Sequence, residues 1–496
     1  EMILNVDITP LGMIIIPLTL CFFLVKPPYL LPLLLSVSVL HAGSVLNGSI
    51  NGFQFGVPPY YFVALIIFAR LCVVLIFKKN YSLNINVPLR ILLCLFLFWL
   101  WAIVSSFLFP HIFQGMKVYN PRLGLAMQYG QGTPLNWTLS NLAQAIYLTL
   151  NIGVIVYVLY AEENSSINYI INGVLIAVII VGMLGLCQTL FSLLDIEFPY
   201  QLINNNIAYY QGYDQYIGFM RRLVCSFTEP SCASTYLASV EVGLLSIYLY
   251  NSLTKKQQFF ICVFIFLYLG LLIRTLATTG YVTLLVSVFL LIFYNTILHS
   301  DKRRLYINRL SIYLQGSIIV FIIVAVSYMS HLDGVNYDSS KNIIDELFRI
   351  INTLISSFVK DKSSLSYIHR TASDLHALKV FISTNGLGVG LGSSRSSSLI
   401  TTLLSTVGII GVSLFSAFVY YILKTISKSQ YENPQYRNIC SFVFWGLLTL
   451  IIAHCISIPD ISFPPTWAYL ISSLTLIQYH LNDNYNCCHQ LGSKRG

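Results

Sequence analysis

The sequence predicts an all-α fold, a polytopic transmembrane helical bundle, and two observations support this. Hydrophobic residues make up 56% of the 496 residues, mean hydropathy is +0.73 and only 9% of residues are charged, whereas ordinary soluble proteins are about 25% charged. Apolar stretches of roughly 18–25 residues recur along the chain, and each is long enough to cross a bilayer as a helix. The short alternating segments typical of a barrel are not seen.

These stretches predict about 12–13 membrane spans in a single integral membrane domain, residues 1–496. The first two stretches are short, and only Lys26, Pro27 and Pro28 separate them. Both twelve and thirteen spans are therefore consistent with the sequence. The expected spans are 9–25, 29–46, 58–77, 89–109, 139–160, 168–192, 231–252, 257–276, 280–299, 311–330, 399–423, 438–457 and 466–481.

Small clusters of Lys and Arg at the span ends predict the orientation, because short loops rich in these residues stay in the cytoplasm. The net charge of +9 is divided among such clusters, which argues against a basic surface for nucleic acid. The clusters on the predicted cytoplasmic side are Lys78-Lys79 with Arg90, Lys255-Lys256, Lys302-Arg303-Arg304, and Lys424 with Lys428.

Three long segments fall on the opposite side, at about 110–138, 193–230 and 331–398, and are predicted to be periplasmic loops. The second is rich in Asn, Gln and Tyr. Amides and hydroxyls hydrogen-bond the hydroxyl groups of sugars, and aromatic rings cover their C–H faces. These loops are therefore either sugar-binding surfaces or ordinary polar loops.

The second loop ends in RRLVCSFTEPS, residues 221–231, with three charged side chains close together. Arg221 and Arg222 are candidates for a diphosphate clamp, because the guanidinium fork grips phosphate and stays charged. Glu229 precedes a predicted helix start at Pro230, where the helix dipole favours an ionised carboxylate. It is a candidate general base, an orienting partner of the arginines, or part of a structural ion pair.

The third loop carries a second charged group within residues 366–394. His369 and His376 are candidate proton acceptors or ordinary surface histidines, and Arg370 and Arg395 are further candidates for binding the diphosphate. A helix is predicted over 371–383 from its apolar spacing.

The glycines of GLGVGLGSS, 386–394, lack the Lys-Ser/Thr of a phosphate-binding P-loop. We expect them to permit a tight turn and a close approach of the backbone to a helix before the next span.

Arg274 ends one span just before a short external turn. An arginine at that depth either faces a polar cavity or extends toward the interface. With His454 and Trp467 expected nearby, a polar chamber at the outer leaflet is one interpretation, with Arg274 at the floor of the diphosphate site. No DxD, CxxC or HExxH pattern suggests a metal or cofactor, and we expect none. A disulfide between Cys225 and Cys232 is a lesser alternative to free thiols.

Three stretches resemble the O-antigen polymerase (Wzy-type) family, within the superfamily that includes O-antigen ligases. They are RRLVCSFTEPSCASTYLA at 221–238, RTLATTGYVTLL at 274–285, and HRTASDLHALKVFISTNGLGVGLGSS at 369–394, and the similarity covers about 139–423. DIEFP at 195–199 also fits. The chain departs from the family in having Cys225 where glycine is common.

The resemblance implies a metal-independent membrane glycosyltransferase of GT-C-like fold at the periplasmic face of the bacterial inner membrane. It would polymerise repeat units of O-antigen or capsule linked to undecaprenyl diphosphate, which serve as donor and acceptor. Arg221, Arg222, Arg274, Arg370 and Arg395 would bind the diphosphate. Membrane lipid and a chain-length regulator protein are the further partners it implies.

Glu229 and His369 are the catalytic candidates within this interpretation. Two other functions remain open from the sequence. One is an O-antigen ligase, which would transfer the glycan to lipid A core. The other is a flippase or transporter of lipid-linked oligosaccharide, although such proteins tend to carry charges near the bilayer midplane and internal repeats.

Overall fold

The structure is a computed structural model, which describes residues 4–50, 53–77, 87–121, 123, 125, 128–129, 131–160, 167–217, 220–250, 253–298, 303–330, 365–432 and 436–493. It is mainly helical, with 73% helix in 14 helices across these ranges. The helices are α1 (Pro10–Val25), α2 (Leu30–Val37), α3 (Pro59–Phe77), α4 (Leu89–Ile112), α5 (Leu139–Tyr160), α6 (Ile167–Leu193), α7 (Pro230–Tyr250), α8 (Lys255–Arg274), α9 (Thr278–Leu298), α10 (Arg303–Ser330), α12 (Leu365–Ser383), α13 (Leu399–Glu432), α14 (Arg437–Ile456) and α15 (Pro464–Ser493).

Eight of the described helices are long and apolar enough to cross a membrane, namely α3 to α8, α13 and α14. Shorter apolar helices lie at 10–25, 27–37 and 278–294. The chain is therefore a multi-pass helical membrane protein. The count of about 12–13 spans stays a prediction, and residues 331–364 of the third expected loop lie outside the described residues.

Helix α7 forms the centre of the bundle, with 89% of its most apolar segment buried. It packs against α8, α9 and α14. Small residues permit this close packing, as is typical of helices in membranes. A Cβ atom on Gly243 would lie 2.8 Å from Cδ2 of Phe442 on α14, and one on Gly280 of α9 would lie 2.4 Å from Cβ of Ser234.

The expected second span, 29–46, is wrong in its second half. Helix α2 ends at Val37, and residues 38–45 form a loop. The leucine-rich run stops there, and Ser36, Ser38 and His41 follow. The next residues form a hairpin, with β2 (Leu46–Ile50) antiparallel to both β1 (Leu4–Ile8) and β3 (Phe53–Val57). An all-α description leaves out this sheet.

Two smaller hairpins lie in the long loops. One pairs β4 (Lys117–Val118) with β5 (Thr133–Pro134), and the other pairs β6 (Tyr216–Ile217) with β7 (Met220–Arg221). Short 3₁₀ turns occupy Pro27–Tyr29 and Tyr200–Leu202.

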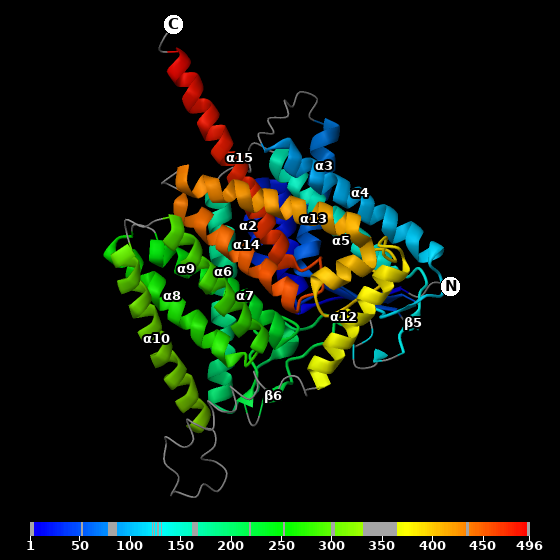
Figure 1. Ribbon diagram of the computed structural model, residues 1–496, viewed down its shortest axis with the longest axis horizontal. Helices are drawn as coiled ribbons and strands as arrows, with labels where there is room; N and C mark the ends of the chain where they lie inside the picture. Colours follow the sequence, from blue (N-terminus) through cyan, green and yellow to red (C-terminus); the bar gives the residue numbers. More distant parts are fainter. Residues whose placement is uncertain are drawn as a thin grey trace, which may run out of the picture.

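Loops far apart in the sequence meet at one end of the bundle, which we call the loop face. It comprises the loops after α2, α4, α6, α12 and α14. The backbone N–H of Ala42 donates to the carbonyl of Ser226 (2.9 Å), and Tyr61 donates to the carbonyl of Ser462 (2.7 Å). Helix α12 packs on α13 close to β4 at this end (Figure 1). The C-terminal end of α15 lies away from the loop face and extends beyond the other helices (Figure 1).

Candidate active site at the loop face

Arg221 is held within its own loop. Its guanidinium forms an ion pair with Asp214, and its Nε donates to the carbonyl of Tyr213 (2.9 Å). The guanidinium carbon also lies 4.4 Å from the ring centroid of Tyr200. These contacts close the loop after α6, and a role of Arg221 in binding diphosphate stays a prediction.

Arg222 projects to the other side, because side chains alternate along an extended strand. Its Nε donates to the carbonyl of Thr275 (3.1 Å), Nη2 to that of Leu276 (3.1 Å) and Nη1 to Oε1 of Gln215 (2.8 Å). Burial lowers the pKa of Arg222, and the positive charge of Arg370 lowers that pKa further, whereas Tyr281 and Glu229 act in the opposite direction. Since a guanidinium stays protonated in proteins, Arg222 is a fixed positive charge.

Arg274 is the last residue of α8. It is only 4% exposed, and its Nη2 donates to Oγ of Ser192 (3.3 Å). Its Nε and Nη1 have no hydrogen-bond partner within the described residues, and Tyr200 is its electrostatic neighbour. The carbonyl of the next residue, Thr275, accepts the hydrogen bond from Nε of Arg222, and a place for Arg274 at the floor of the diphosphate site stays a prediction.

Glu229 lies where the sequence predicts, immediately before the first residue of α7. Its carbonyl accepts the N–H of Ala233 (3.1 Å), which makes it the N-cap residue, and Pro230 takes the first helical position. Its Oε2 accepts a hydrogen bond from Oγ of Ser231 (3.0 Å). The carboxylate acts electrostatically on both Arg222 and His41.

His369 and Arg370 lie on α12, which begins at Leu365, earlier than the expected 371. The ring of His369 lies 5.1 Å from that of Tyr129, whereas Arg370 is the residue that acts on Arg222. Arg370 therefore lies within electrostatic range of Arg222, and His369 packs against a loop tyrosine.

His376, about two turns after His369 along α12, stacks on Tyr119 with centroids 4.6 Å apart. Its Nε2 lies 3.1 Å from the carbonyl of Lys117, and burial lowers its pKa. These contacts make His376 part of the packing between α12 and β4.

Asp374 fixes the loop that carries Arg395. One of its carboxylate oxygens accepts hydrogen bonds from the N–H of Ser397 (3.1 Å) and Oγ1 of Thr401 (2.7 Å), and the other accepts from Oγ of Ser397 (2.5 Å). The backbone N–H of Arg395 donates to the carbonyl of Tyr119 (3.0 Å), while its side chain is exposed. Arg395 is thus presented to solvent from an anchored backbone.

The glycine-rich stretch packs its backbone against a break in α13, as expected from the sequence. Gly388 and Gly390 have φ values of +79° and +103°. The N–H groups of Val389 and Gly390 donate to the carbonyls of Ser405 and Thr406, both at 2.8 Å. The break in α13 is at Gly408, where φ is +65°. These glycines position the loop on α13.

Cys225, at the position where the resembling family commonly has glycine, adopts the left-handed backbone conformation with φ +52°. Gln188 stabilises it from α6, since its Oε1 accepts the N–H of Cys225 (2.9 Å) and its Nε2 donates to the carbonyl (2.6 Å). Cys225 and Cys232 are free thiols.

Two functional candidates were missed by the sequence analysis, His41 and Asp460. His41 lies in the loop after α2, and Asp460 in the loop between α14 and α15. Electrostatic contacts link His41 to Asp460, Glu229 and Arg395. The available signals were a histidine directly after a leucine-rich run and an acidic residue between two spans.

These electrostatic influences define what we call the charged cluster, a set of ionisable side chains from four loops of the loop face and from α12. Glu229 is its shared member, because it acts on Arg222 and on His41. The cluster comprises His41, Arg222, Glu229, Arg370, Arg395 and Asp460.

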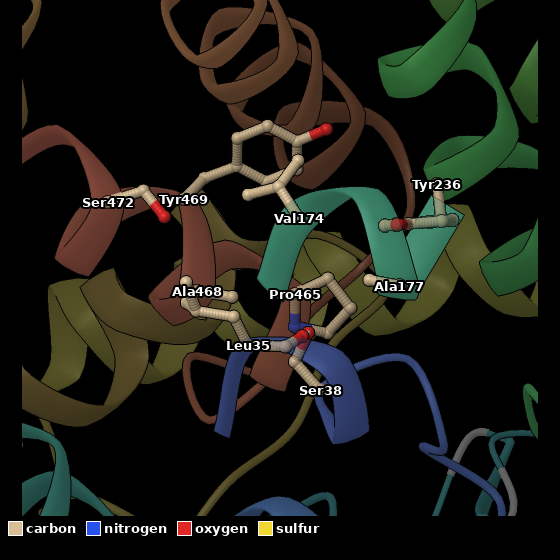
Figure 2. A pocket seen from close by; sticks show the side chains of 9 residues that line it. All are labelled: Leu35, Ser38, Val174, Ala177, Tyr236, Pro465, Ala468, Tyr469 and Ser472. Carbon is tan, nitrogen blue, oxygen red and sulfur yellow. The ribbon is translucent and has the colours of Figure 1, made fainter. Parts of the chain in front are cut away.

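An apolar pocket lies among the helices (Figure 2). Ser38 lines it three residues before His41, and Pro465 lines it five residues after Asp460. The full lining comes from α2, α6, α7, α15 and the residue after α2: Leu35, Ser38, Val174, Ala177, Tyr236, Pro465, Ala468, Tyr469 and Ser472.

No protein-family model matches the chain, and no curated protein matches it in sequence. Within the described residues, no three or more His, Cys, Asp or Glu side chains are grouped so as to hold a metal ion.

Proposed function

We propose that this chain is a metal-independent glycosyltransferase that polymerises undecaprenyl-diphosphate-linked repeat units of O-antigen or capsule at the periplasmic face of the bacterial inner membrane. The observation that carries the proposal is the charged cluster, in which Glu229 and Arg370 lie within electrostatic range of Arg222, and Glu229 and Arg395 within range of His41, at one end of the membrane helices. The sequence resemblance suggests the reaction and its substrate, and the charged cluster supplies side chains suited to that reaction.

The arginines suit a diphosphate leaving group. When the bond between the sugar C1 and the phosphate oxygen breaks, negative charge grows on the diphosphate, and fixed cations lower the barrier. Arg222 is preorganised for this role by hydrogen bonds to two backbone carbonyls. Loss of one such contact typically costs about 3–4 kcal/mol in transition-state stabilisation.

Glu229 is the proposed proton acceptor. As the new bond forms between the acceptor oxygen and C1 of the donor, the hydroxyl proton passes to the Glu229 carboxylate, and the diphosphate leaves with the electrons of the broken bond. General-base assistance of this kind contributes about 10²–10⁴ in rate. His369 is the second candidate, from its position next to Arg370.

The proposal is tested by deleting the gene and separating the lipopolysaccharide on a gel. We expect the ladder to disappear while a single repeat unit remains on the core. Loss of all repeat units would indicate a ligase, and accumulation of lipid-linked repeats on the cytoplasmic side would indicate a flippase. In vitro, purified protein with lipid-linked repeat units should form polymer without added metal.

A further inference from the structure

The charged cluster contains an imidazole whose hydrogen-bonding capacity is unused. His41 is 9% exposed, and its Nδ1 has no hydrogen-bond partner within the described residues. A buried polar atom left without a partner costs about 1–3 kcal/mol. A ligand that supplies a partner would recover that free energy, and the reaction described above gives His41 no task.

The backbone around His41 is fixed by its neighbours. The N–H of Ala42 donates to the carbonyl of Ser226 (2.9 Å), and the carbonyl of Ala42 accepts the N–H of Asn206 (3.1 Å). The imidazole stacks on Tyr209 with centroids 5.5 Å apart, and meets Phe463 edge-on at 5.1 Å. Its orientation is therefore set before any ligand binds.

His41 is neutral at neutral pH. Burial lowers its pKa to about 4, and this outweighs the opposite effects of Asp460 and Glu229, while Arg395 lowers the pKa further. A neutral imidazole has one N–H donor and one nitrogen acceptor. That combination can pair with a hydroxyl group whichever way the hydroxyl hydrogen points.

Asp460 adds a carboxylate to the same place. Its Oδ1 accepts hydrogen bonds from the N–H (2.9 Å) and the Oγ (2.7 Å) of Ser462, which fixes the carboxyl group. Its Oδ2 has no partner within the described residues. The negative charge of Asp460 interacts electrostatically with Tyr147 and Tyr209. Asp460 thus offers one oriented acceptor oxygen beside aromatic side chains.

We propose that His41, Asp460 and Tyr209 form a binding subsite for the acceptor sugar, a pyranose ring with free hydroxyl groups. This inference rests on the proposed function. The imidazole and the Asp460 Oδ2 pair with neighbouring hydroxyls, and the tyrosine ring covers a C–H face. The carboxylates of Asp460 and Glu229 repel anions, so this part of the cluster suits a neutral sugar rather than a second diphosphate.

The arrangement also explains the position of Glu229. The groups that act on His41 are Asp460, Glu229 and Arg395, and those that act on Arg222 include Glu229 and Arg370. Glu229 is common to both sets. Its carboxylate is therefore within electrostatic range of both the proposed sugar subsite and Arg222, which suits a group that receives the proton of the attacking hydroxyl.

The test uses the purified full chain in lipid nanodiscs and two separate probes. One is the lipid-free oligosaccharide repeat, released by mild acid from the lipid-linked repeat of the strain that carries the gene. The other is undecaprenyl diphosphate. Saturation-transfer difference NMR follows the first, and a filter-binding titration follows the second.

We expect Asp460→Asn and His41→Gln each to weaken oligosaccharide binding at least tenfold, with undecaprenyl diphosphate binding within twofold of wild type. The matched control is Glu197→Gln, which removes an exposed carboxylate on the loop after α6 and should change neither. Melting temperatures identify a variant that has lost its fold. If Asp460→Asn is unstable, the His41→Gln result decides.

Unchanged oligosaccharide binding in the variants, or no binding by wild type, would overturn the sugar subsite. A wild-type protein that fails to bind undecaprenyl diphosphate would instead overturn the proposed function. A folded variant that loses binding of both the oligosaccharide and undecaprenyl diphosphate would also contradict the subsite. The sugar and diphosphate regions would then not be distinct.

Discussion

Arg221 and Arg222 are consecutive in the chain, yet their guanidinium groups bind on opposite sides of it. Arg221 pairs with Asp214 and packs over Tyr200, whereas Arg222 donates to the carbonyls that follow α8. The short β6–β7 hairpin causes this separation, because adjacent residues of an extended chain point in opposite directions. Arg222 therefore belongs to the charged cluster, whereas Arg221 stabilises its own loop, and a role of Arg221 in binding diphosphate stays a prediction.

This separation predicts different results for two matched substitutions. Arg222→Lys should lower polymerisation about 10²-fold or more, because an ammonium group cannot replace a planar fork near developing charge. Arg221→Lys should keep more than half of the wild-type rate, since it faces its own loop. Initial rates of polymer formation by purified proteins measure both. Equal losses would mean that the two arginines act together, as the sequence alone suggests.

The proton acceptor is tested by a second pair. Glu229→Gln should bind the lipid-linked donor normally but polymerise about 100-fold more slowly or worse, in the range of general-base effects. His369→Ala should keep more than a tenth of wild-type turnover, because its ring packs on Tyr129. Single-turnover rates at saturating donor separate binding from chemistry. The reverse pattern would make His369 the base and Glu229 a partner of the arginines.

The sequence predicts well what depends on local composition. The start of α7 at Pro230 and the close backbone packing of Gly388 and Gly390 both follow from residue type and short-range spacing. The end of α2 at Val37 was missed, because the apolar run was read as continuous to 46. The Asn-Gly pair at 51–52, a strong hairpin signal, was available and would have indicated β2 and β3.

The contacts of the charged cluster could not be predicted in the same way. His41 and Asp460 are more than 400 positions apart, and only the packing of α2 and α15 brings their loops together. A lone histidine or aspartate carries no information about such a partner. The hydrogen bond from Arg274 to Ser192 of α6 is likewise a long-range contact that the sequence pattern does not indicate.

The glycine loop gives a stability prediction with a matched control. Gly388 and Gly115 have similar φ values, +79° and +84°, but a Cβ on Gly388 would lie 2.5 Å from the carbonyl oxygen of Thr406, and one on Gly115 meets nothing within 4 Å. Gly115→Ala should cost about 1–2 kcal/mol from backbone strain alone. Gly388→Ala should lower the melting temperature clearly more. Equal shifts would contradict close packing of this loop on α13.

His41 predicts how stability depends on pH. Its pKa is lowered from 6.5 to about 4 in the folded state, so between these values the unfolded state binds more protons. The contribution of His41 to the free energy of unfolding is complete above pH 6.5. It falls as the pH drops toward 4, by up to about 3 kcal/mol. His41→Gln removes the contribution. Its melting temperature should fall less steeply between pH 7 and pH 4.5 than that of wild type, and parallel curves would show that His41 is not a buried neutral imidazole.

The orientation of the loop face in the membrane is tested by labelling single cysteines in a cysteine-free background. Gly212 is a poor position, since a Cβ there would lie 2.9 Å from Nε2 of Gln215. Tyr210, on the same loop, is 75% exposed and can be replaced without disturbing packing.

An impermeant maleimide should label Tyr210→Cys in cells whose outer membrane alone is permeabilised. Lys256→Cys, at the exposed start of α8, should react only after the inner membrane is opened, because lysine-rich short loops stay cytoplasmic. The opposite pattern would place the charged cluster in the cytoplasm, away from any periplasmic lipid-linked glycan, and would refute the proposed polymerase.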